Sequence, residues 1–283
     1  MAILLALVSA LCYGTSDFIG GVLSTRIKPW TAAFTGQLAG GLLLVAICLN
    51  SDATLSASAL GWGALAGVGG GVGIVYLYRG LATGRMGVVA PLSGVMAALV
   101  PATVGVLTGD RPSVVSWIGI IAALPATWLV ASATDDVPGD PAPRRAGLGE
   151  GVLDGILAGA GFGIGFAAIA QPPHDTGAWP IAVELLVAAL VAVVGATLAR
   201  EAWLPRTRTA LLASSTGVLA AAALGAFLAA THHGMLAVTS VIAALYPAAT
   251  VLLAVVVLRE RVHRAQALGL ALCAVAVALV AGG

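Results

Sequence analysis

The sequence predicts an all-α integral membrane protein in which ten transmembrane helices form two inverted five-helix repeats. Three observations predict this fold: a scarcity of charge, apolar runs of membrane-spanning length and a similarity between the two halves. Of the 283 residues, 60% are hydrophobic and only 9% are charged. A soluble domain carries about 25% charged residues, because water has to wet its surface. The composition therefore excludes a soluble enzyme, a nucleic-acid-binding protein and a disordered chain.

The glycine, aromatic and cysteine contents favour packed helices over a membrane barrel. Glycine occurs 37 times and aromatic residues make up 5% of the chain. This combination suits close helix packing better than the aromatic girdles of an outer-membrane barrel. The residues Cys12, Cys48 and Cys273 lie inside apolar runs, without the spacing of a disulfide framework or a metal site. We therefore expect no metal and no cofactor.

Ten runs are long enough to cross a bilayer, which takes about 20 mostly apolar residues in a helix. They cover residues 2–22, 30–49, 58–78, 86–108, 113–132, 150–170, 178–199, 209–231, 236–258 and 265–282. The first run lacks the basic start and the cleavage site of a signal peptide, so we expect it to remain as a span. The connections are short, except for a Pro-, Asp- and Arg-rich central loop at residues 134–148.

The basic residues predict how the spans are oriented. Of the 13 Lys and Arg residues, all but Arg111 fall in or beside the loops that follow the odd-numbered spans. Cytoplasmic loops of membrane proteins are enriched in Lys and Arg. We therefore expect a multi-pass protein of the cell (inner) membrane with both termini outside. The residues on the expected cytoplasmic side are Arg26, Lys28, Arg79, Arg85, Arg144, Arg145, Arg200, Arg206, Arg208, Arg259, Arg261 and Arg264.

The two halves of the chain resemble each other at an offset of 149 or 150 residues. The matching pairs are Tyr13-Gly14 with Phe162-Gly163, Trp30 with Trp179, Gly84 with Gly234, Asp110-Arg111 with Glu260-Arg261, and Gly119 with Gly269. The sequence thus divides into a first repeat (1–133), the central loop (134–148) and a second repeat (149–283). Because each half holds five spans, the second half enters the membrane in the opposite sense. Inverted repeats are typical of transporters whose substrate site lies between the halves.

Three stretches resemble EamA-type carriers of the drug/metabolite transporter superfamily. They are ALVSALCYGTSDFIGG (Ala6 to Gly21), the stretch from Tyr78 to Ser113 and the stretch from His232 to Val262. In that family, the fourth helix of each half carries a Pro and ends in a Gly-Glu-Arg-like cap. Pro247 and Arg259-Glu260-Arg261 match this pattern in the second half. The first half departs from it, with Ala97 at the position equivalent to Pro247 and Asp110 in place of Glu.

The resemblance implies a central cavity lined by spans 1–4 and 6–9, with spans 5 and 10 at the periphery. Polar side chains in these cavity helices are candidates for binding substrate or protons, with helix–helix hydrogen bonds as the alternative. They are Tyr13, Gln37, Tyr76, Ser93, Thr239, Ser240 and Tyr246. Among the prolines within spans, Pro91 and Pro247 are the candidates for gating kinks. Asp110 and Glu260 are expected to act as loop caps or local ion pairs.

Two acidic residues stand well inside predicted spans. Charged side chains within a membrane are rare and costly, so Asp17 and Glu184 are candidates for binding a proton or a cationic group of a substrate. A location near a helix end, close to the membrane surface, is the alternative for each. Asp154 lies nearer the start of its span and is expected to complete an N-terminal turn.

Glycines at four-residue spacing dominate two spans. They fall in the segments Gly61 to Gly73 and Gly151 to Gly165, where this spacing places them on one helix face. Two interpretations stay open: surfaces that slide during transport, and static close packing.

Together these patterns predict a secondary-active transporter that exports a small organic metabolite or drug by alternating access, with protons as the coupling ion. The expected partners are a small-molecule substrate, protons and the lipid bilayer, but not nucleic acid, and a homodimer is left open. We do not expect an enzyme, since no catalytic motif of an intramembrane protease is present, and no P-loop indicates an ATP-driven pump. A non-transporting membrane scaffold and an intramembrane enzyme remain the alternatives.

Overall fold

The described residues of the computed structural model are 1–24, 26–82, 86–132, 148–259 and 264–283, and they form helices and no β-strand. The first half contains α1 (Ala2–Ser24), α2 (Pro29–Leu49), α3 (Ala57–Ala82), α4 (Met86–Thr108) and α5 (Val114–Ser132). The second half contains α6 (Leu148–Ile169), a 3₁₀ turn η1 (His174–Thr176), α7 (Trp179–Leu198), α8 (Arg208–Leu212), α9 (Ser214–Thr231), α10 (Leu236–Ala243), α11 (Tyr246–Leu258) and α12 (Arg264–Gly282). The all-α prediction is confirmed. The central loop, Arg85, Glu260 and Arg261 lie outside the described residues, apart from Leu148.

The apolar helices have the length and composition of membrane spans. Within the described ranges, eight helical segments are long and apolar enough to cross a bilayer, and the shorter apolar stretches Leu92–Thr108 and Val114–Val130 accompany them. Two predicted spans are interrupted. The span at 209–231 turns at Ala213 between α8 and α9, and the span at 236–258 breaks at Ala244 and Leu245 between α10 and α11.

The break between α10 and α11 follows from Pro247. Proline has no backbone N–H, and inside a continuous helix its ring would clash with the carbonyl four residues earlier, here that of Ala243. In the structure Pro247 lies in the first turn of α11, where the missing N–H leaves no hydrogen bond unmade. Every residue of α10 is buried, and the N–H of Leu245 donates to the carbonyl of Ile242 at 3.1 Å. The chain therefore contains a short buried helix that ends inside the protein.

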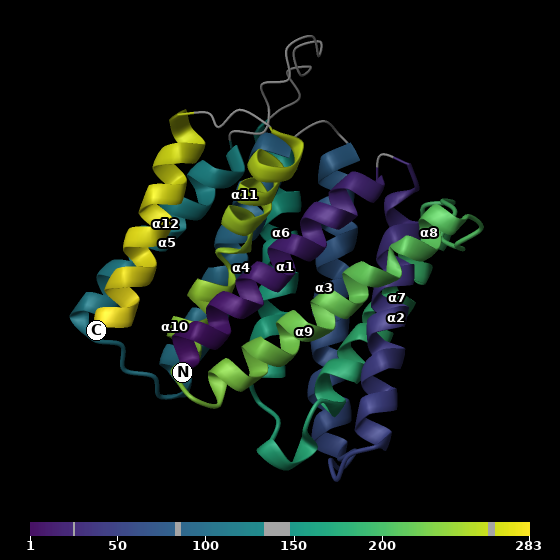
Figure 1. The fold of residues 1–283 in the computed structure, drawn as a ribbon, viewed down its shortest axis with the longest axis horizontal. Coiled ribbons are helices and arrows are strands. Elements are labelled where there is room, and N and C mark those ends of the chain that lie inside the picture. Colours follow the sequence, from purple (N-terminus) through teal and green to yellow (C-terminus); the bar gives the residue numbers. More distant parts are fainter. Residues whose placement is uncertain (25, 83–85, 133–147, 260–263) are drawn as a thin grey trace.

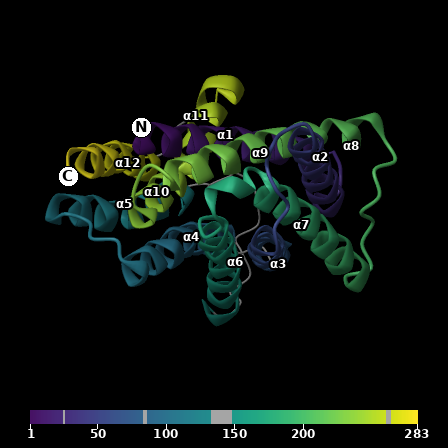
Figure 2. The ribbon, with the colours of Figure 1, turned by 90° about the horizontal axis from the view of Figure 1, so that it is seen from below.

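The two halves interleave instead of forming separate lobes. The most extensive helix–helix contacts all join one half to the other: α3 packs on α6 and α7, α1 on α9 and α11, α2 on α7 and α9, α4 on α6, and α5 on α12. At one end of the molecule α5 lies beside α12, and at the other end α2 lies beside α7 (Figures 1 and 2). Any site at the centre of the bundle is therefore built from both halves.

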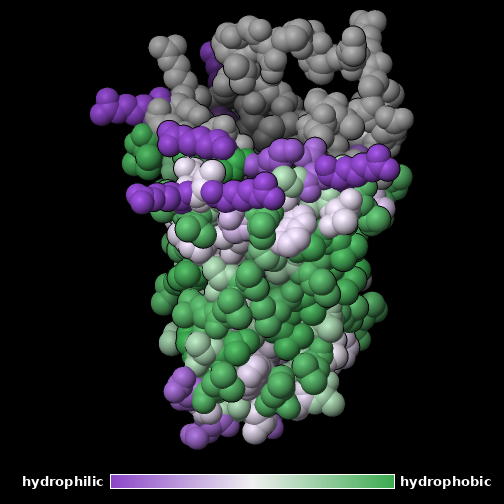
Figure 3. All heavy atoms as spheres, turned by 90° about the vertical axis from the view of Figure 1, so that its right-hand side faces the viewer, coloured by the Kyte–Doolittle hydropathy of each residue, from purple (hydrophilic) through white to green (hydrophobic). Residues whose placement is uncertain are grey.

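The outward faces of the helices are apolar. Large hydrophobic side chains such as Leu42, Leu65, Ile121 and Leu190 are exposed along the helices, which lipid tolerates and water does not. Figure 3 shows a hydrophobic belt with hydrophilic side chains gathered mainly at its upper end. This surface is that of a multi-pass membrane protein.

The glycines at four-residue spacing lie where neighbouring backbones meet. On α3, Gly63 and Gly67 face the backbone carbonyls of Pro180 and Glu184 on α7, while Gly69 faces Gly161 of α6. On α6, Gly155, Gly159 and Gly163 face α4 in the same way. Each glycine series at four-residue spacing therefore lies on one helix face, as predicted, and a Cβ at these positions would overlap a neighbouring helix.

Gly217 on α9 offers a direct test of this packing. A Cβ added there would overlap the carbonyl group of Gly36 on α2, which is backbone and cannot rotate away. We expect Gly217→Val to destabilise the protein by about 1–3 kcal/mol or more, measured as a lower midpoint of thermal unfolding in detergent. Gly225 on the same helix has open space around its Cβ position, so Gly225→Val is the matched control. An unchanged midpoint for Gly217→Val would contradict the packing described here.

Candidate functional site

Glu184 is a buried carboxylate at the junction of three helices. It lies in the second turn of α7 and is 8% exposed. Gly70 of α3 and Gly165 of α6 face it, since a Cβ at either position would lie 3.9 or 4.0 Å from its Oε1. Its Oε2 accepts no hydrogen bond from the part of the chain that the structure describes. A buried carboxylate oxygen without a donor is costly, which singles out Glu184 as a functional candidate.

A cluster of aromatic rings from four helices lies beside Glu184. The ring of Tyr13 on α1 lies 5.7 Å from that of Phe166 on α6 and 6.1 Å from that of Tyr246 on α11. Phe166 in turn contacts Phe227 of α9 at 4.9 Å. We call Tyr13, Phe166, Phe227 and Tyr246 the aromatic cluster. Tyr13 belongs to the first half of the chain and the other three rings to the second half, so the contacts that Tyr13 makes join the two halves.

Tyr13 connects the aromatic cluster to both predicted carboxylates. Its hydroxyl interacts electrostatically with Glu184 and also with Asp17, and Tyr246 likewise interacts with Asp17. Asp17 follows Tyr13 by four residues on α1, about 6 Å further along the helix axis, and its side chain is exposed. The structure thus brings four predicted residues, Tyr13, Asp17, Glu184 and Tyr246, into one neighbourhood.

The hydroxyls of α10 bond within their own helix. Thr239 Oγ1 donates to the carbonyl of Met235 at 3.0 Å, and Ser240 Oγ donates to the carbonyl of Ala237 at 3.4 Å. Both side chains are fully buried. A substrate role for Thr239 and Ser240 stays a prediction. To bind substrate as donors, these hydroxyls would have to exchange their hydrogen bonds to the helix backbone for hydrogen bonds to the substrate.

The remaining predicted residues lie on α2, α3 and α4. Gln37 on α2 has a buried Oε1 that meets no hydrogen-bond donor within the described ranges. Ser93 on α4 is buried, and its backbone carbonyl packs against Gly159 of α6. Tyr76 lies on α3, and Pro91 lies within α4, where its side chain falls outside the described residues. Their substrate and gating roles also stay predictions.

The expectation for Asp154 is wrong. Because α6 begins at Leu148, Asp154 is its seventh residue, beyond the first turn, and it is only 3% exposed. It therefore does not complete an N-terminal turn, where the free backbone N–H groups of a helix lie.

Asp110 caps a helix of the other half. Its Oδ2 accepts a hydrogen bond of 2.8 Å from the backbone N–H of Ala237, in the first turn of α10. A carboxylate at this point satisfies one of the free N–H groups of a helix start and complements the helix dipole. The predicted capping role is thus present, but the capped helix lies across the repeat boundary, which sequence spacing did not indicate.

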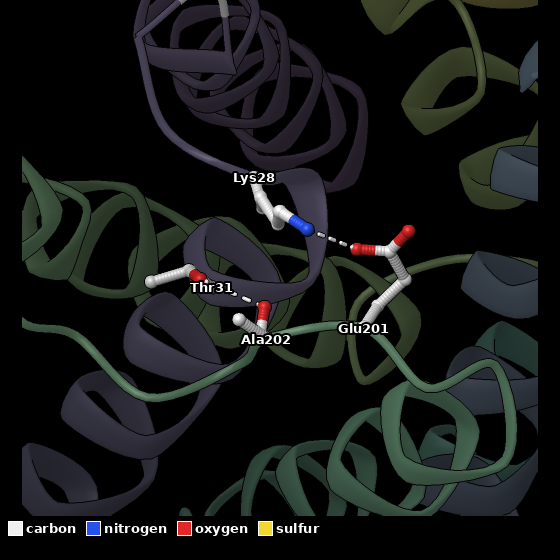
Figure 4. Close-up of polar contacts among 4 residues, drawn as sticks. All are labelled: Lys28, Thr31, Glu201 and Ala202. Carbon is white, nitrogen blue, oxygen red and sulfur yellow. Dashed lines mark hydrogen bonds and ion pairs between the residues drawn. The ribbon is translucent and has the colours of Figure 1, made fainter.

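Two groups of contacts join the halves at opposite ends of α2. At its start, Lys28 forms an ion pair with Glu201, Thr31 Oγ1 donates to the carbonyl of Ala202 at 3.1 Å (Figure 4), and the rings of Phe34 and Trp203 lie 4.9 Å apart. We call these six residues the Lys28 clamp. Beyond the end of α2, Trp179 Nε1 donates to the carbonyl of Ala53 at 3.1 Å, and the N–H of Thr54 donates to the carbonyl of Asp175 at 3.2 Å. We call these four residues the Trp179 clamp.

Sequence reasoning missed both clamps and two rings of the aromatic cluster. Phe166 and Phe227 are two of only five Phe residues, and their position inside spans is the one signal that could have marked them. The clamp partners lie more than 120 residues apart in the sequence, and no pattern in a single sequence pairs them.

Comparison with known proteins connects this arrangement to a transporter family. The model of the EamA-like transporter family matches residues 1–132 and 149–282, nearly the whole chain. The chain belongs to the EamA-like transporter family. The resemblance stated from the sequence is therefore confirmed, and this EamA-like protein is a multi-pass membrane protein of a transporter family.

Solved structures add a likeness of fold. The EamA-like chain is similar to one described only as "Crystal structure of protein", with a TM-score of 0.77 and 18% identity, over 98% of this chain and 95% of the other. At this identity the likeness shows the fold alone. No curated protein matches the chain.

Proposed function

We propose that this EamA-like protein is a secondary-active transporter that exports a small organic solute by alternating access and uses protons as the coupling ion. The observation that carries the proposal is the buried Glu184, whose Oε2 meets no described donor where helices of both halves join. An ionised carboxylate in an apolar interior is costly unless it binds a proton or pairs with a cation. Glu184 therefore suits a group that is loaded and unloaded during a transport cycle.

Reciprocal contacts support two inverted repeats of five spans. Gly119 of α5 packs on the carbonyl of Ala276 and on Val280 of α12, while Gly269 of α12 packs on the carbonyl of Ala126 and on Val130 of α5. The residue numbers of one contact become those of the other when 150 is added to the residue of α5 and subtracted from the residues of α12. The two separate ranges of the family match support the same division into residues 1–133 and 149–283.

Backbone geometry adds a further correspondence between the repeats. Gly109 directly follows α4 with a φ of 124°, and Arg259 directly follows α11 with a φ of 57°. These residues are again 150 apart, and both end their helix with a positive φ. In this interpretation α8 with α9, and α10 with α11, each count as one span, which gives ten.

The two clamps support alternating access. The Lys28 clamp joins the α1–α2 loop to the α7–α8 loop, and the Trp179 clamp joins the α6–α7 loop to the α2–α3 loop. In the proposed repeats, the α1–α2 loop corresponds to the α6–α7 loop, and the α7–α8 loop corresponds to the α2–α3 loop. The two clamps are therefore counterparts at opposite ends of the bundle. Inverted-repeat transporters open their two ends in turn. We propose that the clamps release alternately, with bends at Pro91 and Pro247 as the gating kinks.

The charge distribution supports a cytoplasmic location for the Lys28 clamp. The exposed residues Arg26, Lys28, Arg200 and Arg206 lie at this end of the bundle, and cytoplasmic loops are enriched in such residues. Both termini would then lie outside the inner membrane. We expect alkaline phosphatase fused to the C-terminus to be active and a green fluorescent protein fusion there to be dark. The reverse result would contradict this orientation.

Transport itself is tested with purified protein in liposomes. We expect a pH gradient imposed across the membrane to drive flux of at least one solute from a panel of metabolites and drugs, and empty liposomes to show none. Comparing metabolites inside cells and in the medium, between deletion and overexpression strains, would select the panel and show the direction. Absence of flux for every solute under any gradient would overturn the transporter proposal and favour a scaffold. The homodimer stays a prediction, which the molar mass of the solubilised protein tests.

A further inference from the structure

The neighbourhood of Glu184 combines aromatic rings with negative charge. Tyr13, Phe166 and Tyr246 approach one another from α1, α6 and α11, and Tyr13 lies within electrostatic range of the carboxyls of both Glu184 and Asp17. The faces of aromatic rings carry negative electrostatic potential. Rings and carboxylates therefore favour the same kind of ligand group, one that carries a positive charge.

The described part of the chain does not supply that positive charge. Its basic side chains lie in loops or at helix ends, as Arg26, Arg111, Arg200 and Arg264 illustrate. The only ion pair within the described ranges joins Lys28 to Glu201 at the end of the bundle. Glu184, which is more than nine-tenths buried, has an Oε2 with no hydrogen-bond donor in these ranges. A ligand cation would therefore meet an unpaired carboxylate.

The chemistry of the site favours an organic cation over a metal ion. No group of three or more His, Cys, Asp or Glu side chains that could hold a metal occurs in the described ranges, whereas a hard divalent cation takes six or more oxygen ligands. Aromatic faces attract weakly hydrated ammonium groups by cation–π interaction, and more strongly when the cation has left water. An apolar lining would accept the hydrocarbon part of such a molecule.

We propose that the solute bound beside Glu184 is an organic cation, an amine or quaternary ammonium compound with an apolar body, whose charged nitrogen lies between Glu184 and the ring of Tyr13. The proposal rests on the proposed function in taking this neighbourhood as the transport site. Phe166 and Tyr246 contact the apolar body, and Asp17 provides a second negative charge further along α1.

Equilibrium binding to the full-length protein in detergent tests this proposal without any gradient. The probes are benzyltrimethylammonium and N,N-dimethylbenzamide, a neutral aromatic compound of similar size, with calorimetry as the readout. We expect the cation to bind at least about ten-fold more tightly than the neutral compound, as pairing with an unsatisfied buried carboxylate implies. Equal binding of the two, or no binding of the cation, would overturn the proposal.

Four variants locate the site. We expect Glu184→Gln to weaken cation binding at least about ten-fold and Tyr13→Leu to weaken it about 3- to 30-fold, while Tyr13→Phe keeps the ring and the affinity. The exposed Asp52 in the α2–α3 loop supplies the control Asp52→Asn. Thermal unfolding midpoints show which variants are folded. Unchanged binding in a folded Glu184→Gln protein would overturn the proposal, whereas tight binding without flux in liposomes would count against the transporter proposal alone.

Discussion

Replacing Glu184 with Gln is expected to abolish solute flux driven by a pH gradient. The amide has the shape of the carboxyl group but cannot bind and release a proton, so the flux should fall below about a tenth of that of the wild type. The described titratable groups that interact with this neighbourhood are Tyr13 and Asp17 of α1 and Tyr246 of α11, and Tyr13 contacts two rings of the cluster. The measurement is solute uptake into liposomes as a function of internal and external pH.

The companion variant Asp17→Asn shows which carboxylate carries the proton. Asp17 is exposed and lies about one turn from Tyr13, so we expect its loss to reduce the flux without removing the pH dependence. Wild-type pH dependence in both variants would eliminate the proton-coupling proposal. The thermal unfolding midpoint of each variant separates a loss of coupling from a loss of fold.

Covalently closing either clamp is expected to stop transport. For the Lys28 clamp the variant is Thr31→Cys with Ala202→Cys, since Thr31 Oγ1 and the carbonyl oxygen of Ala202 are 3.1 Å apart. We expect a short cleavable cross-linker between the two thiols to block flux nearly completely, because a transporter confined to one conformation cannot complete its cycle. Reductive cleavage of the cross-linker should restore it.

This experiment needs a protein without native cysteines and a second cross-link at the Trp179 clamp. The three native residues Cys12, Cys48 and Cys273 are free thiols and must first be replaced by Ala, and each single-Cys variant treated with the reagent is the control. At the other clamp, the corresponding variant is Ala53→Cys with Trp179→Cys, because the indole of Trp179 donates a hydrogen bond to the carbonyl of Ala53. The same cross-linker would join these two thiols. Alternating access requires both cross-links to block flux, and a channel that stays open at one end would tolerate one of them.

The helices were predictable because a membrane span is encoded locally. About 20 apolar residues between charged or turn-forming positions suffice to predict a span, and eight of the predicted spans appear as single helices. From Pro247 the sequence predicts a bend within one span, whereas the structure has two separate helices, α10 and α11. The sequence marks the residue that cannot continue a helix, whereas burial of all of α10 depends on the helices around it.

The candidate site was predictable residue by residue but not as an arrangement. Asp17 and Glu184 stood out because charge within a span is scarce, and Tyr13 and Tyr246 because the resemblance to the family marked their helices. The approach of Tyr13 to Phe166, and the pairing of Thr31 with Ala202, connect residues about 150 or more positions apart. Such contacts follow from how the halves interleave, and no local pattern in one sequence contains that information.

The contact between α5 and α12 has the form of an isologous interface, in which one surface meets a copy of itself. Gly119 occupies the place on α5 that Gly269 occupies on α12, and the partners Ala276 with Val280 and Ala126 with Val130 correspond in the same way. In a twofold interface between identical subunits, a substitution appears on both sides of the interface. Under the proposed inverted repeat, the two surfaces belong to one polypeptide, so each side can be altered alone. Such a proposed repeat can diverge on one side while its geometry is kept. It can therefore carry a carboxylate such as Glu184 in only one half: at the offset of 149 that relates Trp30 to Trp179, the equivalent position of the first half is Thr35.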